Sequence, residues 1–522
     1  MPQTALVKHT RRRHKAVRTG CYTCKIRRVK CDEAQPACAK CTSTGRKCDG
    51  YPPKAESRLS VPAGLNPSLF ADAIDAMTFD FFRRRTVPQL FGYFDTSSFW
   101  GHRTLQISYN EPAVRYAANA LSELHRNFED SLGQRGQWDR VRQQSTLTHY
   151  AAALSHMKHI LQSPNSSLDV LLVACLLLAS VETFQGRYEA ADVHLRCALR
   201  ISATINNTDT QEKSPSLHHT QEVLKHPILC ALVRLRVQCG LFLNLGSAIP
   251  KALTDIGPYL PVEIPDHFTS LSEARDTLFT QIGNFFRITN QVALTKTSTS
   301  EATGDLEDRI KHYMAEVNHD PVITQLQYVR VMGLERWKRA YEEFMSVYSR
   351  QLSPADVRAS RFLDLYRDTL DIILHIDYTK GIMAADDFED EFDMLLGKLR
   401  QFINDSNAAQ AQSMFTFEMG IIPLLYFLAT DCRNYTTRHA AYALLAASRS
   451  REGTWDASAV CKAAEKLIAF EEANRVRGVL GAEGIAQDHR VLEMEAQLDL
   501  VRRRAVVVFY HFHGSKTEVI TW

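Results

Sequence analysis

The chain has 522 residues, of which 45% are apolar and 23% are charged, a composition typical of an ordinary soluble globular protein. This length is too great for one compact core, so we expect two or more domains. The net charge of +3 hides an asymmetry: residues 1–51 hold 13 Lys/Arg against 3 Asp/Glu, and the remainder holds 49 against 56. A basic head on a mildly acidic body indicates that only the head meets a polyanion.

The sequence gives no sign of a membrane or secreted protein. Its longest apolar runs, residues 170–181 and 419–430, have twelve residues each, whereas a membrane-spanning helix needs about 20. We therefore predict that both runs are buried core helices. The first twenty residues lack the apolar segment of a secretory signal. We expect an intracellular protein with reduced thiols and no membrane partner.

The chain begins with a basic tail, which we assign to residues 1–20. The tail contains a cluster of five cations: Lys8, Arg11, Arg12, Arg13 and Lys15. Such a cluster is typical of a nuclear import signal or of an arm that contacts phosphates. The alternative is a solvated tail without a binding role.

Half of the twelve cysteines lie in residues 21–48, which we assign as the second domain. They are Cys21, Cys24, Cys31, Cys38, Cys41 and Cys48, and the spacing of the first three repeats in the last three. A Cys-x2-Cys turn brings two sulfurs to one tetrahedral metal, and a third can return after about two helical turns. Each half supplies three thiolates, whereas a closed zinc site uses four. The count closes for two metals if two sulfurs each bridge both.

Other uses of these cysteines have to be weighed. A disulfide framework suits small secreted domains, and iron–sulfur ligation or a redox pair explains neither the repeat nor the charge. A zinc knot that never contacts DNA is the strongest of these alternatives. The gap between Cys24 and Cys31 holds four cations, whereas the gap between Cys41 and Cys48 holds two and the helix-weakening Gly45. This asymmetry favours a first half that faces nucleic acid.

The segment resembles the fungal binuclear zinc cluster, the DNA-binding module of a large family of fungal transcription factors. The resemblance is carried by the six-cysteine spacing, the basic run KIRRVK, the CDEAQPAC loop with its proline, and CAKC. It implies two zinc ions, with Cys21 and Cys38 as the bridging pair. The implied ligands are Cys21, Cys24, Cys31 and Cys38 for the first ion, and Cys21, Cys38, Cys41 and Cys48 for the second.

The resemblance also implies how the module reads double-stranded DNA. Arg27 and Arg28 occupy the base-reading positions, and Lys25 and Lys30 are expected to contact phosphates. An arginine that bonds guanine O6 and N7 together contributes about 1–3 kcal/mol of discrimination. Family members commonly read CGG-type half-sites. The implied function is therefore regulation of RNA polymerase II transcription in the nucleus, with the transcription machinery or co-regulators as partners and a metabolic or secondary-metabolite gene set as target.

Residues 49–75 are rich in Pro, Ser, Gly and Ala, and we predict a flexible linker there. The linker shows no sustained heptad pattern, so a coiled-coil dimeriser directly behind the head is not expected. A homodimer formed through the body is an open alternative to a monomer.

We predict an all-α body over residues 76–522. One apolar stripe illustrates its helical periodicity: Leu334, Trp337, Tyr341, Phe344 and Tyr348. The one short strand candidate is RRAVVVFYHF near the end. In residues 384–399, which mix acids with Phe388 and Phe392, we predict a helix with a buried face rather than a transactivation segment.

The start of the body also carries a resemblance. Residues 79–100 and 111–125 resemble the beginning of the regulatory region in many fungal zinc-cluster factors. Arg83, Arg84 and Arg85 are interpreted as cations near the end of a helix that stops before Val87-Pro88, rather than as a nucleic-acid patch.

The body carries none of the common catalytic signatures, such as GxGxxG, a phosphate-binding GxxxxGK[ST], HExxH or GxSxG. We therefore predict no catalytic residues and do not expect an enzyme. The main alternative to a sequence-specific transcription factor is a zinc-stabilised interaction protein whose basic head binds nucleic acid without sequence preference.

Overall fold

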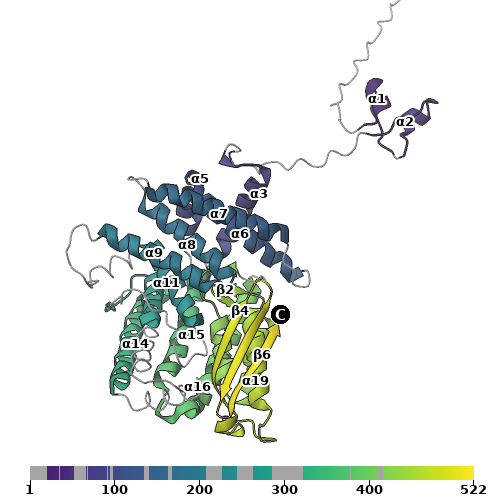
Figure 1. Ribbon diagram of the computed structural model, residues 1–522. Coiled ribbons are helices and arrows are strands. Elements are labelled where there is room, and N and C mark those ends of the chain that lie inside the picture. The colour runs from purple at the N-terminus through teal and green to yellow at the C-terminus, as the bar shows by residue number, and fades with distance from the viewer. Residues whose placement is uncertain are drawn as a thin grey trace, which may run out of the picture. The chain divides into compact units, whose positions relative to one another are not determined.

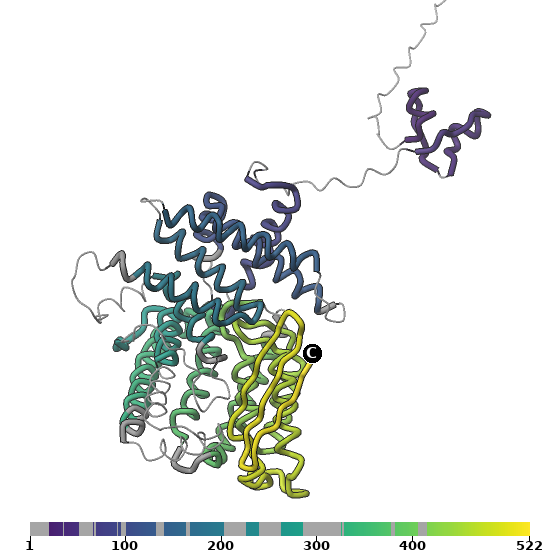
Figure 2. Tube along the Cα trace, viewed as in Figure 1, coloured from purple at the N-terminus to yellow at the C-terminus, as the bar shows by residue number. Residues whose placement is uncertain are grey.

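The computed structural model describes the following residues: 20–34, 36–51, 66, 69–90, 92–94, 98–133, 140–162, 167–206, 226–243, 263–284, 321–376, 378–409 and 415–522. The basic cluster between Lys8 and Lys15 lies outside these residues, and so does most of the predicted linker. The chain divides into two compact units, residues 1–76 and 77–522 (Figures 1 and 2).

The first unit contains two short helices, α1 (Tyr22–Ile26) and α2 (Ala39–Thr42). The buried cluster of this unit consists of Cys21, Cys24, Cys38 and Cys41, with Cys31, Cys48 and Tyr51 packed against it. These thiols stand where a larger domain has aliphatic side chains. The folding of such a module therefore depends on the metal that its thiols bind.

The second unit is mainly helical, as predicted. The helices in the first half of the chain are α3 (Ala73–Phe81), η2 (Phe82–Thr86), α4 (Val87–Leu90), η3 (Ser98–Thr104), α5 (Leu105–Asn110), α6 (Pro112–Gly133), α7 (Arg140–Gln162), α8 (Leu168–Phe184), α9 (Tyr188–Asn206) and α11 (Pro227–Leu243). Those that follow are residues 271–284, α14 (Pro321–Tyr348), η5 (Ser349–Gln351), α15 (Pro354–His375), η6 (Tyr378–Phe388), α16 (Glu389–Ala409), α17 (Ile422–Asp431), α18 (Tyr435–Ala447), α19 (Ala457–Glu472), η7 (Ala482–Gly484) and η8 (Gln487–His489).

Two small sheets accompany the helices. In the first, β2 (Arg451–Glu452) pairs with β1 (Phe415–Thr416) in parallel and with β3 (Trp455–Asp456) antiparallel. The second is an antiparallel sheet of β4 (Val491–Asp499), β5 (Arg504–His511) and β6 (Gly514–Thr521), with β5 in the centre. The predicted strand candidate is β5, whereas β4 and β6 were not predicted. Figure 1 shows this yellow sheet beside α19, which contacts both β5 and β6.

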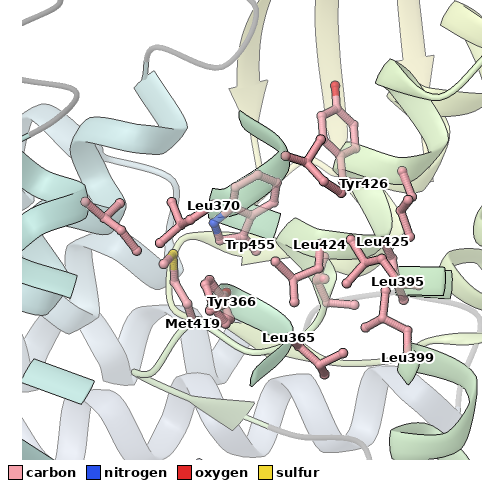
Figure 3. Close-up of a cluster of buried hydrophobic side chains, with 14 of the residues drawn as sticks. Leu365, Tyr366, Leu370, Leu395, Leu399, Met419, Leu424, Leu425, Tyr426 and Trp455 are labelled. Carbon is pink, nitrogen blue, oxygen red and sulfur yellow. The ribbon is translucent and has the colours of Figure 1, made fainter. Parts of the chain in front are cut away.

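The apolar runs lie in the core. Every residue from Val170 to Phe184 in α8 is buried, and α17 buries seven of its ten residues. Figure 3 shows how α15, α16 and α17 contribute to one buried cluster, with Tyr366, Leu395 and Leu425 among its members. None of the described helices is both long and apolar enough to cross a membrane.

The predicted stripe on α14 is largely confirmed. Leu334, Trp337, Tyr341 and Phe344 are buried. Tyr348 is 42% exposed, because the helix ends at this residue. The acidic segment forms a helix with a buried face, as predicted. Phe392, Leu395 and Leu396 are buried, whereas Phe388, the fourth predicted member of this face, lies at the end of η6 and is only partly buried.

The predicted helix end before Val87-Pro88 is wrong, because the helical chain continues from α3 through η2 into α4. The Val87 N–H donates to the Phe82 carbonyl, five residues back, so η2 is a π-helical turn. Such a wide turn suits the approach to Pro88, which has no N–H to continue the usual ladder.

The three arginines of this segment form ion pairs within the protein. Arg83 and Arg84 contact Asp80 at 2.6 and 3.0 Å, and Arg85 contacts Glu129 at 2.8 Å. These contacts support the interpretation of the arginines as structural cations rather than as a nucleic-acid patch.

Candidate metal centre and nucleic-acid interface

The six cysteines of the first unit gather into two groups of four. One group is Cys21, Cys24, Cys31 and Cys38, and the other is Cys21, Cys38, Cys41 and Cys48. Within each group the sulfur atoms all lie within 4.8 Å of one another. Cys21 and Cys38 belong to both groups, so the structure brings together the sets that the sequence analysis expected.

The distances between sulfur atoms suit zinc. Around a tetrahedral Zn²⁺ with Zn–S bonds of about 2.3 Å, neighbouring sulfurs stand about 3.8 Å apart. The Sγ of Cys38 lies 3.6 Å from the Sγ atoms of Cys21 and Cys24, and the Sγ of Cys41 lies 3.8 Å from the Sγ of Cys21. The thiols therefore fit a pair of zinc ions that share ligands.

Backbone N–H groups point at several cysteine sulfurs and stabilise their thiolate forms. The N–H of Cys24 points at the Cys21 sulfur at 3.3 Å, and the N–H groups of Cys21 and Glu33 point at the Cys31 sulfur at 3.5 and 3.4 Å. Burial raises the pKa of Cys31, but these two donors, together with the Tyr51 hydroxyl and the Cys38 thiol, outweigh it and lower that pKa to about 7. Burial dominates at Cys24 and raises its pKa. A buried thiolate at Cys24 therefore needs a cation, which zinc supplies.

A left-handed turn ends α1. The N–H of Arg28 donates to the Lys25 carbonyl at 3.1 Å, and the N–H of Val29 donates to the Cys24 carbonyl, also at 3.1 Å. This pattern needs a positive φ at its central residue, and Arg28 has a φ of 54°. The turn bends the chain after the helix and leaves the Arg28 side chain exposed.

The same turn ends α2, seventeen residues later. The N–H of Gly45 donates to the Thr42 carbonyl at 3.1 Å, and the N–H of Arg46 donates to the Cys41 carbonyl at 3.0 Å. Gly45 has a φ of 64°. The internal repeat is thus structural as well as sequential, and Gly45 corresponds to Arg28.

Two aspartates that the sequence analysis did not single out hold the module together. Each directly follows the last cysteine of its half. The Asp32 carboxylate accepts the N–H groups of Ala39 and Lys40 at 2.9 and 3.1 Å, which caps α2 and lowers the pKa of Asp32. Asp49 accepts the Thr23 hydroxyl at 2.8 Å, which ties the end of the module to α1. The repeated Cys-Asp pair was a signal that could have identified both.

The module extends slightly beyond its predicted end at Cys48. The Tyr51 hydroxyl donates to the Ala34 carbonyl at 2.7 Å and lies 3.8 Å from the Cys31 sulfur. The N–H of Tyr22 donates to the Gly50 carbonyl at 3.0 Å. The chain up to Tyr51 therefore packs with the cysteines.

The four predicted DNA-contacting residues have different surroundings. The Arg27 guanidinium donates to the Thr44 hydroxyl at 3.2 Å and to the Lys40 carbonyl at 3.4 Å, so it joins the two halves of the module. Lys25 is exposed, with its ammonium 5.8 Å from the centre of the Tyr22 ring.

Arg28 and Lys30 are exposed, and their side chains form no hydrogen bond or ion pair with any residue that the structure describes. Six thiolates and two Zn²⁺ ions together carry a net charge of −2. Only part of the positive charge on the surrounding Lys and Arg side chains is therefore needed to balance the charge of the cluster. Arg28 and Lys30 can therefore bind an external anion.

Each of the two units contains residues that match a known protein family. Residues 19–58 match the family described as the fungal Zn(2)-Cys(6) binuclear cluster domain, which binds two zinc ions. Residues 77–226, which contain α6 to α9, match the fungal specific transcription factor domain. No solved structure matches the chain.

Several characterised proteins are similar to this chain. An aspercryptin biosynthesis cluster-specific transcription regulator of Emericella nidulans is 24% identical over 87% of this chain and 87% of its own length. A transcription regulator of Purpureocillium lilacinum is 29% identical over 38% of this chain and 52% of its own length. A transcriptional regulatory protein of Schizosaccharomyces pombe is 47% identical over 12% of each chain.

The geometry of the thiols, the two family matches and the similar regulators agree. The chain therefore carries a fungal Zn(2)-Cys(6) binuclear cluster domain and a fungal specific transcription factor domain, and the proteins similar to it are named as transcription regulators.

Proposed function

We propose that this chain regulates RNA polymerase II transcription by reading CGG-type half-sites in double-stranded DNA through its zinc cluster. The observation that carries the proposal is the state of Arg28. Its side chain is exposed and unpaired among the described residues, and its backbone is held in the left-handed turn at the end of α1. The turn fixes the backbone of Arg28 while its guanidinium is available for an external partner, which suits bidentate recognition of guanine.

The proposed ligand set follows the two groups of sulfurs. Cys24 and Cys31 hold the first zinc ion, Cys41 and Cys48 hold the second, and the pair Cys21 and Cys38 bridges both. The shared membership of the bridging pair supports this assignment. When bound, the two ions would offset four of the six thiolate charges and hold α1 against α2.

The cations around Arg28 take different roles in the proposal. Lys25 and Lys30 contact phosphates, because both are exposed point charges near Arg28. Arg27 is engaged with Thr44 and Lys40, so it reads a base only after its guanidinium leaves them. Arg28 is therefore the principal base-reading residue, and Arg27 mainly supports the docking of the two halves.

A secondary-metabolite gene set is the proposed target. The relative from Emericella nidulans is named for a biosynthesis cluster, and its similarity extends over 87% of both chains. A nuclear protein is expected from this role, with the cluster from Lys8 to Lys15 as the import signal or phosphate arm. The body would bind the transcription machinery or co-regulators.

The proposal is tested by binding the full-length protein to a CGG-containing duplex and to a scrambled duplex at one fixed salt concentration. Both duplexes are tested with zinc and with a chelator. Arg28→Ala is compared with Arg46→Ala, which removes the same charge from an exposed arginine in the second half of the module. We expect a zinc-dependent preference for CGG that Arg28→Ala reduces by about 1–3 kcal/mol and Arg46→Ala leaves in place.

Equal binding to the two duplexes would instead support the zinc-stabilised interaction protein, whose head binds nucleic acid without sequence preference. Salt dependence cannot separate the two functions, because both neutralise phosphates. The ratio of the two affinities does.

A further inference from the structure

The second unit contains a cavity of about 330 Å³ that none of the features described above uses. It lies between α19 and α17 on one side and the sheet β4–β5–β6 on the other, and the first turn of α9 also lines it. This volume is at the lower end of the range of about 300–1,000 Å³ that small-molecule sites occupy.

Small side chains keep the cavity open. Ala459 and Ala463 stand one helical turn apart on α19, and Ala496 faces the cavity from β4. Elsewhere the same core is filled by large side chains such as Trp337 and Phe392, as expected for a close-packed interior. A single alanine exchanged for a larger residue would therefore fill much of this space.

The cavity holds one polar group that is poorly satisfied. Tyr426 is only 5% exposed, and its hydroxyl lies 3.6 Å from the sulfur of Met494, a weak acceptor. Both residues line the cavity. Figure 3 shows the Tyr426 ring at the edge of the hydrophobic cluster, with its oxygen pointing away from the other labelled side chains. A ligand oxygen would be a better acceptor for this hydroxyl than the thioether is.

The charges around the cavity restrict the ligand further. Glu189 and Gln497 line it and are exposed, so they form its polar rim. Among the residues that the structure describes, those that line the cavity include one carboxylate and neither lysine nor arginine. Such a lining disfavours an anion, and the apolar walls, among them Val507 and Ile520, favour an organic body.

We propose that this cavity binds a neutral or cationic, partly apolar organic molecule that offers a hydrogen-bond acceptor, such as a ketone oxygen, to the Tyr426 hydroxyl. The ligand would contact α9, from the region matched by the fungal transcription factor domain, together with the C-terminal sheet. These parts already approach closely: a Cβ atom at Gly186, before α9, would lie 3.0 Å from the Leu500 side chain. This ligand site lies in the second unit, so its existence does not rest on the proposed recognition of DNA by the zinc cluster.

The test uses the full-length protein and prodan, a neutral naphthalene dye that carries a ketone and changes its emission in apolar sites. We expect saturable binding of one dye per chain, with emission shifted to the blue. Ala463→Phe, which fills the cavity, should weaken binding at least tenfold. Tyr426→Phe should weaken it roughly three- to tenfold, the effect of one hydrogen bond. Circular dichroism confirms that each variant is folded.

The matched control is Tyr341→Phe, which removes a buried hydroxyl that donates to the Ser360 carbonyl; neither residue belongs to the cavity lining. It should bind prodan as the wild type does, and the anionic dye anilinonaphthalene sulfonate should bind the wild type at least tenfold more weakly than prodan. The proposal is overturned if the wild type shows no saturable binding, if Tyr426→Phe and Tyr341→Phe behave alike, or if the anionic dye binds as well as prodan. If Ala463→Phe does not fold, the comparison of the two tyrosine variants decides alone.

Discussion

Arg28 and Gly45 occupy equivalent positions in the two halves of the zinc module. Each follows the second cysteine of its half by four residues, and each adopts a left-handed backbone, with φ values of 54° and 64°. Glycine adopts this conformation freely, whereas an L-residue with a side chain pays about 1–2 kcal/mol. The first half therefore keeps a strained arginine where the second half has the residue that the turn prefers.

This relationship predicts opposite effects on stability and on recognition. Arg28→Gly should relieve the strain, and part of that gain is lost to the larger backbone entropy of glycine, so we expect a net stabilisation on the order of 0.5–1 kcal/mol. The variant should nevertheless lose its preference for CGG. Stability is measured as resistance of the bound zinc to a chelator, and recognition as the ratio of affinities for CGG and scrambled duplexes.

Gly45→Ala is the matched control for the backbone. Among the described residues, no atom outside Gly45 and its two chain neighbours lies within 4 Å of the position that its Cβ would take, so only the positive φ penalises the substitution. We expect zinc to be released more easily, by about 1 kcal/mol, while the preference for CGG persists. If Arg28→Gly released zinc more easily than the wild type, the strain at Arg28 would be refuted.

A second prediction concerns the phosphates. Lys30 and Lys47 precede the third cysteine of their halves and are both exposed. Because the first half is proposed to face DNA, Lys30→Ala should weaken binding to all sequences alike and reduce the slope of log K against log salt by about 1. Lys47→Ala should leave the slope nearly unchanged. Titrations at several salt concentrations measure both, and equal slopes for the two variants would show that the module does not approach DNA with its first half.

The shared cysteines give a third prediction, on metal content. The wild type should hold two zinc ions per chain. Cys38→Ser removes a sulfur that belongs to both groups, so we expect the loss of both ions, whereas Cys24→Ser affects one group and should retain more zinc. Elemental analysis of the purified variants measures this directly. Cys175→Ser, in the body, is the control and should keep two ions. Equal zinc loss in Cys24→Ser and Cys38→Ser would contradict the bridging role of Cys38.

The metal site could be predicted from the sequence because ligand spacing is local information. The spacing alone left the bridging pair open, and the assignment of Cys21 and Cys38 came from the resemblance to the fungal binuclear zinc cluster. The left-handed turn at Arg28 was harder to predict, because an arginine does not signal a positive φ. The signal was present only in the repeat, which aligns Arg28 with Gly45. The contact of Arg27 with Thr44 joins the two halves and has no signature in either half alone.

In the body, the conformation of some segments depends on pairing with distant segments, and the local sequence pattern could not predict it. The strand β5 was recognisable from its run of valines, whereas β4 contains Glu493, Met494, Glu495 and Ala496, residues that favour helices. Its strand conformation depends on the antiparallel register with β5, in which Met494 pairs with Phe509. Burial along β4 does not alternate strictly, and the register shifts between Val491 and Glu493, so a period of two does not mark this strand.

A fourth prediction concerns a buried ionic cluster on α19. The Glu471 carboxylate accepts from the guanidinium groups of Arg433 and Arg438 and, at 2.9 Å, from the N–H of Val491. Glu471 and Arg438 have no exposed surface. Glu471→Ala would leave the buried Arg433 and Arg438 without this carboxylate, and of its described ion pairs Arg438 would keep only the 3.4 Å contact with Glu472, so we expect a destabilisation of about 3–5 kcal/mol. Chemical denaturation measures the change.

Glu465→Ala is the control for this cluster. Glu465 lies on the same helix and pairs with Lys462, and both side chains are about two-fifths exposed. The loss of such a surface pair should cost about 0–1 kcal/mol. Similar costs for the two variants would mean that the buried cluster stabilises the fold no more than a surface pair does.

The last prediction concerns pH and the carboxyl group of Glu452, which is buried beside the start of α17. Burial raises its pKa from 4.5 to about 7, although the N–H groups of Ile422, Ile421 and Gly420 partly oppose the shift. The folded protein therefore binds a proton that the unfolded chain releases as pH rises above 4.5. The stability from this group is fully present below pH 4.5 and is lost as pH rises through 7.

Glu452→Gln cannot titrate, so the stability of this variant should fall less between pH 5 and pH 8 than that of the wild type. One pKa unit corresponds to about 1.4 kcal/mol, so we expect a difference on the order of 2–3 kcal/mol across the window. Thermal unfolding at several pH values measures it, with Glu342→Gln, an exposed carboxylate on α14, as the control. Parallel pH profiles for the wild type and Glu452→Gln would show that the buried carboxyl group titrates in the folded protein as it does in the unfolded chain, since only a difference between the two pKa values makes stability depend on pH.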